Sequence, residues 1–323
     1  MNICIVGYGA IGPVHAESVS LLENVNLYAI CDIDKTLADK GASTYNCKAI
    51  YDFSEVLEDK NIDSIHICTP HYLHFEMIKQ AIDAGKSVVV EKPITMKRDE
   101  FYYLLKHYNT APIFPIIQNR TNLCIKTLKE LVSADDTLGK LIAVKGILTW
   151  YRNEDYYKSG DWRGTKEFEG GGVLINQAVH TLDLLTYFGG EVSSVFASAS
   201  NKSLQNVIEV EDTVDAYIKF KNGATGVFFA TNAYTPGSSV FIELAFENAH
   251  FRYIDGKLYK DGALLCEDET KFLGKSYWGS GHERTLYDHY TLNKNLSLSD
   301  IKTTMDTMFA IYESAEKNKE VIL

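Results

Sequence analysis

A glycine-rich turn directly after the first apolar run constrains the fold of this chain more than any other feature. The run 2–6 is short and rich in β-branched residues, which is typical of a buried parallel strand, and the turn 7–12 reads Gly-Tyr-Gly-Ala-Ile-Gly. In such a G-x-G-x-x-G the first glycine allows a tight turn, the second lets backbone approach a pyrophosphate, and the third lets the next helix pack on the strand. Pro13 suits the first turn of that helix. The turn therefore predicts a dinucleotide-binding site.

An acidic residue stands at the distance that this motif requires. Asp32 ends the second apolar run, 27–31, and lies 20 residues after Gly12, a spacing at which an acid meets the adenosine ribose hydroxyls. A carboxylate there repels a 2′-phosphate, so we expect NAD as the cofactor, with NADP left open. The alternative for the whole motif is a glycine-rich turn without a ligand.

Strands and helices alternate through the first part of the chain. Apolar runs occur at 2–6, 27–31, 48–51, 64–68, 87–90 and 113–117, with helical patterns between them. This alternation predicts an α/β fold, a Rossmann-type doubly wound parallel sheet over residues 1–120. Ligands of such sheets bind at the carboxyl ends of the strands, so the segments 7–12, 69–71 and 91–93 should line one crevice.

The segment Glu91-Lys92-Pro93 follows one of these strands and supplies the first candidate for chemistry. A residue before proline avoids the helical region, so Lys92 is expected to be extended at the strand end. Beside a dinucleotide it could hydrogen-bond a substrate oxygen or share a proton. The alternative is a surface lysine that happens to end a strand.

From residue 140 the pattern changes to long β-rich runs. They occupy 141–151, 192–199, 214–220, 225–231, 240–246 and 250–254, with a hairpin turn at 221–223. Consecutive strands predict a large open sheet, mostly antiparallel or mixed, which makes residues 121–323 a second, α+β domain. An open sheet exposes an apolar face unless a second subunit covers it, so we expect a homodimer or homotetramer.

One helix, predicted over 173–188 after the triple glycine 170–172, interrupts this sheet. Asn176, His180 and Asp183 lie four and three residues apart and would share one face of it. A solvated helix face is the alternative. The glycines, which would let backbone approach a ligand closely, favour a site, in which Asp183 or the substrate would tune the imidazole.

The segment before this helix is dense in aromatic and hydrogen-bonding side chains. The stretches 150–152 and 161–164 include Trp162 and Arg163. Such a mixture suits sugars, whose C–H faces stack on aromatic rings while their hydroxyls take hydrogen bonds. The alternative is a tyrosine-rich loop at a subunit contact.

Composition excludes several classes of function. A net charge of −11 argues against binding nucleic acid through a basic face. No apolar run approaches the ~18 residues of a membrane span, and we expect no signal peptide because the chain opens on a strand. Six scattered cysteines without a C-x-x-C indicate a reducing, cytoplasmic compartment and no metal site. His282 and His289 are expected to be cap or surface residues.

The motifs together resemble the Gfo/Idh/MocA oxidoreductases, the family named for glucose–fructose oxidoreductase and inositol dehydrogenase. The resemblance covers essentially the whole chain and is carried by 7–12, Asp32, the run 68–74 (Cys-Thr-Pro-His-Tyr-Leu-His) and Ala84-Gly85-Lys86 before Glu91-Lys92-Pro93. It implies that His180 is the catalytic histidine. Asn176 departs from the aspartate usual in inositol dehydrogenases, as in some members acting on nucleotide-linked sugars.

A second departure, His71 in place of the usual asparagine, affects only a minor cofactor contact. The expected cofactor-binding residues are Gly7, Gly9, Ala10, Ile11, Gly12, Asp32, Cys68, Thr69, Pro70, His74, Glu91, Lys92 and Pro93. The expected catalytic residues are Lys92, His180 and Asn176, and the substrate would also meet Trp162, Arg163 and Gln177.

The resulting hypothesis is an NAD(P)-dependent dehydrogenase acting on a secondary hydroxyl of a sugar or cyclitol, possibly nucleotide-linked. His180 would accept the hydroxyl proton, and Lys92 would stabilise the developing alkoxide. The rival from another class is a dinucleotide-binding sensor without turnover. A dihydrodiol dehydrogenase or biliverdin reductase type is a further rival, although those members lack a histidine at the position of His180.

Overall fold

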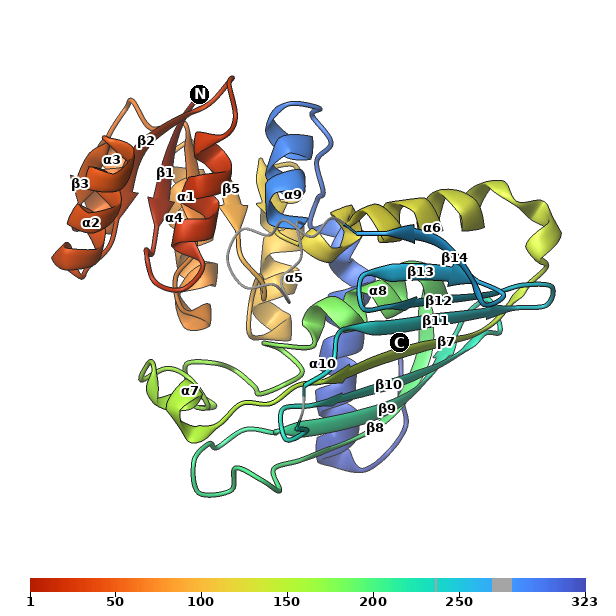
Figure 1. Ribbon diagram of the computed structural model, residues 1–323. Helices are drawn as coiled ribbons and strands as arrows, with labels where there is room; N and C mark the ends of the chain where they lie inside the picture. The colour runs from red at the N-terminus through yellow and green to blue at the C-terminus, as the bar shows by residue number, and fades with distance from the viewer. Residues whose placement is uncertain (236, 269–280) are drawn as a thin grey trace. The chain divides into compact units, whose positions relative to one another are not determined.

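The computed structural model describes residues 1–235, 237–268 and 281–323 (Figure 1). The chain divides into two compact units, which are described separately. The first comprises residues 1–95, 99–118 and, of the later described residues, 281–300; the second comprises 96–98, 119–268 without residue 236, and 301–323. The predicted boundary at residue 120 lies close to the end of the segment 99–118. The segment 281–300, which the sequence pattern placed in the second domain, packs instead with the first unit.

The first unit contains a six-stranded, wholly parallel sheet in the order β3-β2-β1-β4-β5-β6. This order confirms the predicted Rossmann-type fold. Its strands are β1 (Asn2–Val6), β2 (Asn26–Cys31), β3 (Lys48–Ile50), β4 (Ser64–Ile67), β5 (Ser87–Val90) and β6 (Ile113–Pro115). Its helices are α1 (Gly12–Ser20), α2 (Lys35–Tyr45), α3 (Phe53–Glu58), α4 (His74–Asp83), α5 (Arg98–His107, of which Arg98 groups with the second unit) and α9 (Gly281–Tyr290).

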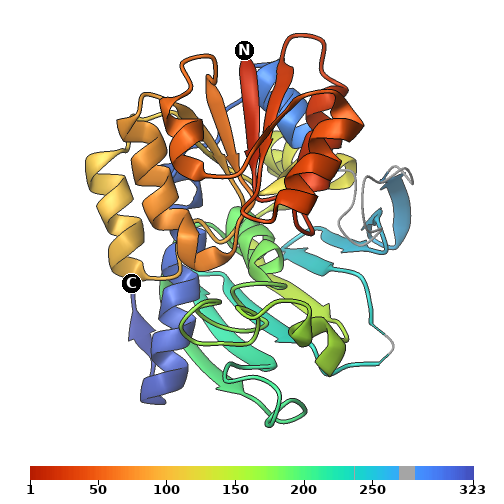
Figure 2. The ribbon, with the colours of Figure 1, turned by 90° about the vertical axis from the view of Figure 1, so that its left-hand side faces the viewer.

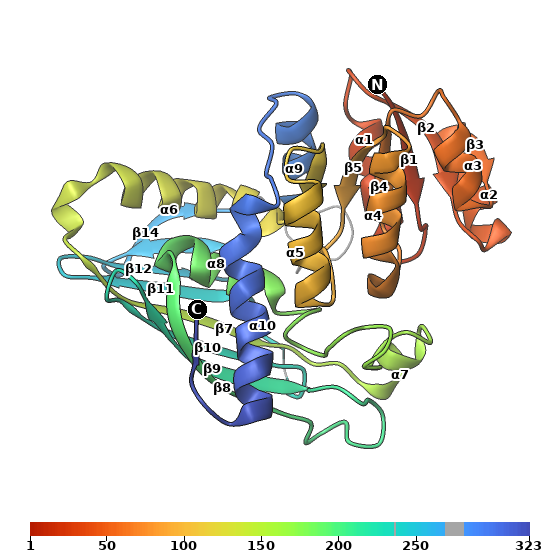
Figure 3. The same ribbon diagram turned by 180° about the vertical axis from the view of Figure 1, so that it is seen from behind.

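Helices cover both faces of this sheet, which explains why its strands are apolar on both sides. Helices α1 and α9 lie in front of the sheet in Figure 1, and α4 and α5 lie in front of it in the reverse view of Figure 3. Figure 2 shows the strands running between these two layers. Ile3, Ile5, Ile30, Ile65 and Val89 are completely buried between them.

The second unit is built on a nine-stranded sheet in the order β14-β13-β12-β11-β7-β10-β9-β8-β15. Among the strands that the structure describes in this sheet, only the β7–β10 pair is parallel, so the predicted large, mostly antiparallel sheet is confirmed. Its strands are β7 (Leu141–Thr149), β8 (Val192–Ser200), β9 (Thr213–Phe220), β10 (Thr225–Thr231), β11 (Phe241–Phe246), β12 (His250–Ile254), β13 (Lys257–Lys260), β14 (Ala263–Glu267) and β15 (Val321–Ile322). The pattern after Ile254 had not indicated β13 and β14.

Two helices cover one face of the second sheet. They are α8 (Val179–Gly189) and α10 (Lys302–Lys317), which lie before the sheet in Figure 3. The unit also contains α6 (Leu123–Ala134) and the short α7 (Glu154–Lys158). Gly146 of β7 leaves room for α8, because a β-carbon there would come within 3.1 Å of the Leu185 side chain. In the described ranges of the chain, no helix combines the length and the apolar character needed to cross a membrane.

The prediction that a helix begins at residue 173 is wrong, because α8 begins only at Val179. The preceding residues form turns, in which the N–H of Ala178 bonds to the carbonyl of Val173, five residues back. The start of this segment is held from outside: the backbone N–H groups of Gly172 and Leu174 donate to the carboxylate of Glu211. Asn176 is consequently not on the same helix as His180.

Candidate active site

The glycine-rich turn has the geometry that a dinucleotide needs. Gly7 has a φ of +89°, and a β-carbon there would lie 2.7 Å from the carbonyl oxygen of Cys68. A β-carbon on Gly12 would overlap the carbonyl oxygen of Gly7, so both positions require glycine for internal reasons. Gly9 differs, since nothing lies within 4 Å of its missing β-carbon and the residue is exposed. The space that a pyrophosphate would use is therefore open at Gly9, next to Ala10 (exposed) and Ile11, the N-cap of α1.

Asp32 is fixed at the end of β2 by two backbone N–H groups. Its carboxylate accepts from Tyr8, within the glycine-rich turn, at 2.7 Å and from Asp34 at 2.9 Å. The half-buried carboxylate is thus held beside the turn, as the spacing in the sequence predicts. These residues fit a nicotinamide dinucleotide, with the turn for its phosphates and Asp32 for a ribose.

The loop after β4 is tied to the segment after β5 by a histidine. Both ring nitrogens of the fully buried His74 contact carbonyl oxygens, that of Pro93 at 2.7 Å and that of Thr69 at 2.9 Å. Burial lowers the pKa of His74 in spite of these two contacts. His74 was expected to contact the cofactor. In the structure its ring contacts the carbonyl groups of Thr69 and Pro93 and so connects the two loops. Cys68 is also buried, and Pro70 is half-buried.

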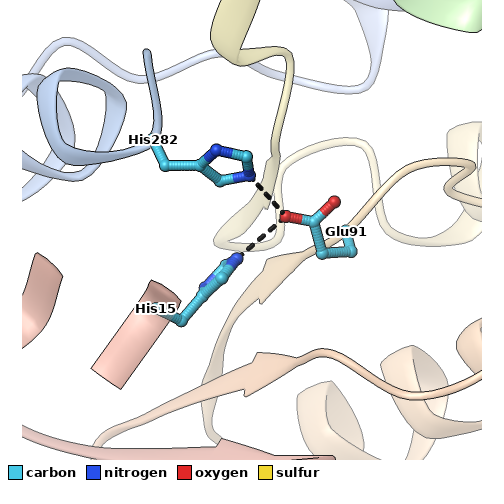
Figure 4. Close-up of side chains that lie close together, drawn as sticks. All are labelled: His15, Glu91 and His282. Carbon is cyan, nitrogen blue, oxygen red and sulfur yellow. Dashed lines mark hydrogen bonds and ion pairs between the residues drawn. The ribbon is translucent and has the colours of Figure 1, made fainter. Parts of the chain in front are cut away.

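Glu91 is the centre of a buried cluster that the sequence did not reveal. One carboxylate oxygen, Oε1, lies 2.8 Å from Nε2 of His15 on α1 and 3.2 Å from Nε2 of His282 on α9 (Figure 4). The expectation that His282 is a cap or surface residue is wrong, because only 3% of it is exposed. Its chain distance from Glu91 left no local signal that could have predicted the contact. Beside the cluster, Lys92 is half-buried.

The charge of this cluster resides on the carboxylate. Burial by itself would raise the pKa of Glu91, but the hydrogen bonds from His15 and His282 outweigh it and hold that pKa well below its ordinary range. Burial also lowers the pKa of His15, which outweighs the opposite influence of Glu91. The cluster therefore combines an ionised Glu91 carboxylate with a neutral His15 imidazole.

In the second unit, the triple glycine packs against the protein itself. A β-carbon on Gly170, whose φ is +83°, would lie 2.8 Å from the Met96 side chain. One on Gly171 would overlap the Tyr312 hydroxyl, and one on Gly172 would overlap the backbone of Glu211. The glycines had been interpreted as room for a ligand. The structure explains them by close packing.

Asn176 is oriented by a buried acid that the sequence analysis missed. Its side-chain amide donates to Glu169, whose other carboxylate oxygen accepts the N–H of Gly164. Burial raises the pKa of Glu169, and these two donors oppose that shift. Because a carboxylate accepts hydrogen bonds, it selects the NH2 end of the Asn176 amide and directs the amide oxygen away from itself.

His180 lies in the first turn of α8 and is buried. Tuning of the imidazole by Asp183 or the substrate stays a prediction. The Asp183 carboxylate forms a two-point ion pair with Arg120 at 2.6 and 2.8 Å. It also accepts the hydroxyl of Thr304 at 2.8 Å. These contacts anchor α8 through Asp183.

The aromatic segment forms a connected network with Gln177. The guanidinium of Arg163 donates to the Tyr156 hydroxyl at 2.9 Å and lies 4.4 Å from the centre of the Trp162 ring. Gln177 donates to the same hydroxyl at 3.0 Å and accepts from Asn232 at 2.9 Å. Three of the predicted substrate residues are thus brought together, with Tyr156 and Asn232 as additions that sequence reasoning missed.

Comparisons with known proteins point to one family for both parts of the chain. The family model described as "Oxidoreductase family, NAD-binding Rossmann fold" matches residues 1–111, and the "GFO/IDH/MocA C-terminal domain" matches residues 125–252. Myo-inositol 2-dehydrogenase of Thermotoga maritima is 28% identical over 236 residues, which are 70% of this chain and 67% of the relative. Levoglucosan dehydrogenase of Pseudarthrobacter phenanthrenivorans is 24% identical over 278 residues, 76% and 71% of the two chains.

A solved structure shows the same fold. The WlbA dehydrogenase of Bordetella pertussis, crystallised with NADH and UDP-GlcNAcA, has a TM-score of 0.88 at 23% identity, covering 100% of this chain and 97% of that one. With family models matching both its parts, the chain belongs to the Gfo/Idh/MocA oxidoreductases and is an NAD-dependent enzyme of that family.

Proposed function

We propose that this enzyme oxidises a secondary hydroxyl of a sugar or cyclitol, with a nucleotide-linked sugar as one form of that substrate. The observation that carries the proposal is the network of Arg163, Trp162, Tyr156 and Gln177, which offers aromatic surface and hydrogen-bonding groups together. Relatives named for inositol and levoglucosan, and a neighbour of the same fold crystallised with a nucleotide sugar, support this substrate class. They favour an enzyme over a dinucleotide sensor.

The chemistry divides between a cofactor and two side chains. NAD, which the glycine-rich turn and Asp32 would hold, would supply the hydride acceptor for oxidation of the carbinol carbon to a carbonyl carbon. We assign the hydroxyl proton to His180, and Lys92 stabilises the negative charge that develops on the oxygen. Asn176, oriented by Glu169, presents its amide oxygen to a substrate hydroxyl or to the imidazole.

The cofactor preference rests on Asp32. Its carboxylate is held beside the glycine-rich turn, where it can accept hydrogen bonds from ribose hydroxyls and would repel a 2′-phosphate. Fluorescence titrations should show tighter binding of NADH than of NADPH, and Asp32→Ala should narrow the difference. Tenfold tighter binding of NADPH, about 1.4 kcal/mol, would contradict this assignment.

We also propose that the enzyme is a homodimer or homotetramer through the sheet face opposite α8 and α10. Phe196, Tyr217 and Val227 stand side by side on three adjacent strands and are 48%, 45% and 49% exposed. An apolar row of this kind on an open sheet suits a subunit interface. Light scattering should show an oligomer that Tyr217→Asp weakens; a wild-type monomer at micromolar concentration would refute the proposal.

A reducing, cytoplasmic location completes the proposal. The cysteines are free thiols, and the sulfur atoms of Cys124 and Cys266 lie 3.1 Å apart without a bond between them. An oxidising compartment would favour joining such a pair. Alkylation of freshly lysed cells followed by intact-mass measurement should find both thiols reduced.

The substrate is tested by a screen of cyclitols, sugars and nucleotide sugars with NAD, read as NADH absorbance. Wild-type enzyme should reduce NAD with at least one of them. Lys92→Met, which keeps most of the stem but loses the donor, and His180→Ala should each lower the rate by roughly 10²–10⁴. NADH binding should be retained by both variants. Wild-type rates in both variants would contradict the assigned roles.

A further inference from the structure

A continuous line of hydrogen bonds crosses the first unit and ends at Glu91. It begins at Ser64 on β4, whose hydroxyl lies 3.1 Å from the hydroxyl of Tyr290 on α9. That hydroxyl lies 2.7 Å from Nε2 of His66, and Nδ1 of His66 lies 2.9 Å from Nδ1 of His15. The other ring nitrogen of His15 contacts Glu91. Residues from three elements far apart in the sequence, β4, α9 and α1, are thus connected to a single carboxylate.

The carboxylate fixes the direction of every bond in this line. An ionised Glu91 can only accept, so Nε2 of His15 donates to it and Nδ1 of His15 must accept from His66. Nε2 of His66 then accepts the hydroxyl hydrogen of Tyr290, whose oxygen accepts from Ser64. Each imidazole on this line is neutral and uses both of its nitrogens. His282 adds a second N–H to the same carboxylate oxygen, as Figure 4 shows.

The other carboxylate oxygen of Glu91 accepts a hydrogen bond from the backbone of Lys92, the residue proposed to stabilise the developing alkoxide. Oε2 accepts the N–H of Lys92 at 3.2 Å, and on the following residue the carbonyl of Pro93 is held by His74 at 2.7 Å. The backbone of Lys92 is therefore braced on both sides. His15 lies on α1, the helix that starts in the glycine-rich turn, so one brace runs directly to the element predicted to carry the cofactor phosphates.

We propose that His15 and His282 are positioning residues for Lys92: through the Glu91 carboxylate they fix the backbone from which the lysine projects. This inference rests on the proposed role of Lys92. Misplacing a catalytic group by an ångström can cost on the order of 10²-fold in rate. Loosening the brace should therefore lower kcat, although neither histidine contacts substrate in this account.

The same three side chains also match the ligand arrangement of a divalent metal site. His15, Glu91 and His282 each offer a ligand atom within 4.8 Å of the others, and all three are buried. A metal would require both Nε2 atoms without hydrogen. The Nε2 atoms of His15 and His282 lie 2.8 and 3.2 Å from Oε1 of Glu91, which are distances of N–H···O hydrogen bonds. These distances favour the positioning role over a metal site.

The experiment compares His15→Leu and His282→Leu with His282→Gln, which keeps an N–H donor. His107→Leu, on the exposed last turn of α5, is the matched control. Because buried substitutions can reduce the folded fraction, kcat is expressed per NADH-binding site from titration. We expect both Leu variants to lose roughly tenfold or more in kcat with NADH affinity nearly unchanged. His282→Gln should recover most of the loss, and the control should match wild type.

A double-mutant cycle asks whether the histidines act through the lysine. In a Lys92→Met background, His282→Leu should have little further effect on the residual kcat. Multiplicative losses, unchanged kcat in both Leu variants, or parallel losses of kcat and NADH affinity would each overturn the inference. One bound divalent ion per wild-type chain, lost in His282→Leu, would overturn it in favour of a metal site. Wild-type kcat in Lys92→Met would instead refute the proposed role of Lys92.

Discussion

The pKa values of three buried carboxylates are shifted in opposite directions. That of Glu91, in the first unit, is lowered, and those of Glu169 and Glu211, in the second unit, are raised. Glu91 receives hydrogen bonds from two imidazoles, and its pKa lies well below the ordinary range. Glu211 receives the N–H groups of Gly172 and Leu174 and the Tyr312 hydroxyl, yet burial dominates and raises its pKa. The pKa of Glu169 is raised for the same reason.

The difference teaches that the kind of donor decides in which direction the pKa of a buried acid is shifted. Hydrogen bonds from imidazole side chains outweigh the desolvation of Glu91 and lower its pKa, which favours a negative charge beside Lys92. Backbone and amide donors only partly offset the desolvation of Glu169 and Glu211. Those two acids hold loops in shape around the triple glycine and Asn176.

The largest loss of stability is expected from removing the Glu91 carboxylate. Glu91→Leu leaves His15, His282 and the Lys92 N–H without their acceptor inside the protein, so the free energy of unfolding should fall by about 3 kcal/mol or more. Urea unfolding measures it. Glu313→Gln, which breaks the partly exposed pairs with Lys317 and Arg98, is the control and should change little. Equal free energies of unfolding for Glu91→Leu and wild type would contradict the proposed difference between Glu91 and the two buried carboxylates of the second unit.

A smaller loss is expected in the second unit. Glu211→Gln leaves one acceptor oxygen for three donors, so we expect a loss of about 1–2 kcal/mol. The same urea series measures it. A loss larger than that of Glu91→Leu would reverse the proposed ranking of the two carboxylates.

The pH dependence of stability should separate the two kinds of site. The folded pKa of Glu211 is raised, so its stabilising contribution is full below the unfolded pKa and declines as pH rises through the folded pKa. The folded pKa of Glu91 is depressed, so its contribution is full above the unfolded pKa and is lost as pH falls towards the folded pKa. From about pH 5 to 7, the wild-type advantage over Glu211→Gln should shrink, and that over Glu91→Gln should stay level. Parallel slopes would contradict the comparison.

The smallest effect concerns the orientation of Asn176. Asn176→Asp would set a second carboxylate against Glu169, so one of them should take a proton and stability should fall by about 1 kcal/mol at neutral pH. Adding Glu169→Gln should restore a donor–acceptor pair and recover that loss. Denaturation of the two single variants and the double variant tests this coupling. Strict additivity would show that the two side chains do not act together.

Local patterns predicted the fold and the framework of the cofactor site, because strand alternation, the glycine spacing and Asp32 act over short stretches of chain. The predicted start of a helix at residue 173 failed because Glu211, distant in sequence, holds the segment in turns. His282 could not be predicted for the same reason, since its partner is Glu91. Long-range contacts of buried polar groups leave no periodic signal in a sequence.

Deuterium transfer tests the central claim most directly. The best substrate from the screen is prepared with deuterium on the carbinol carbon and incubated with NAD and the wild-type enzyme. Mass spectrometry of the reduced cofactor should find one deuterium per NADH, together with a slower rate than the unlabelled substrate if hydride transfer limits turnover. NADH without deuterium, or tight NAD binding with no reduction on any sugar, cyclitol or nucleotide sugar, would contradict the account.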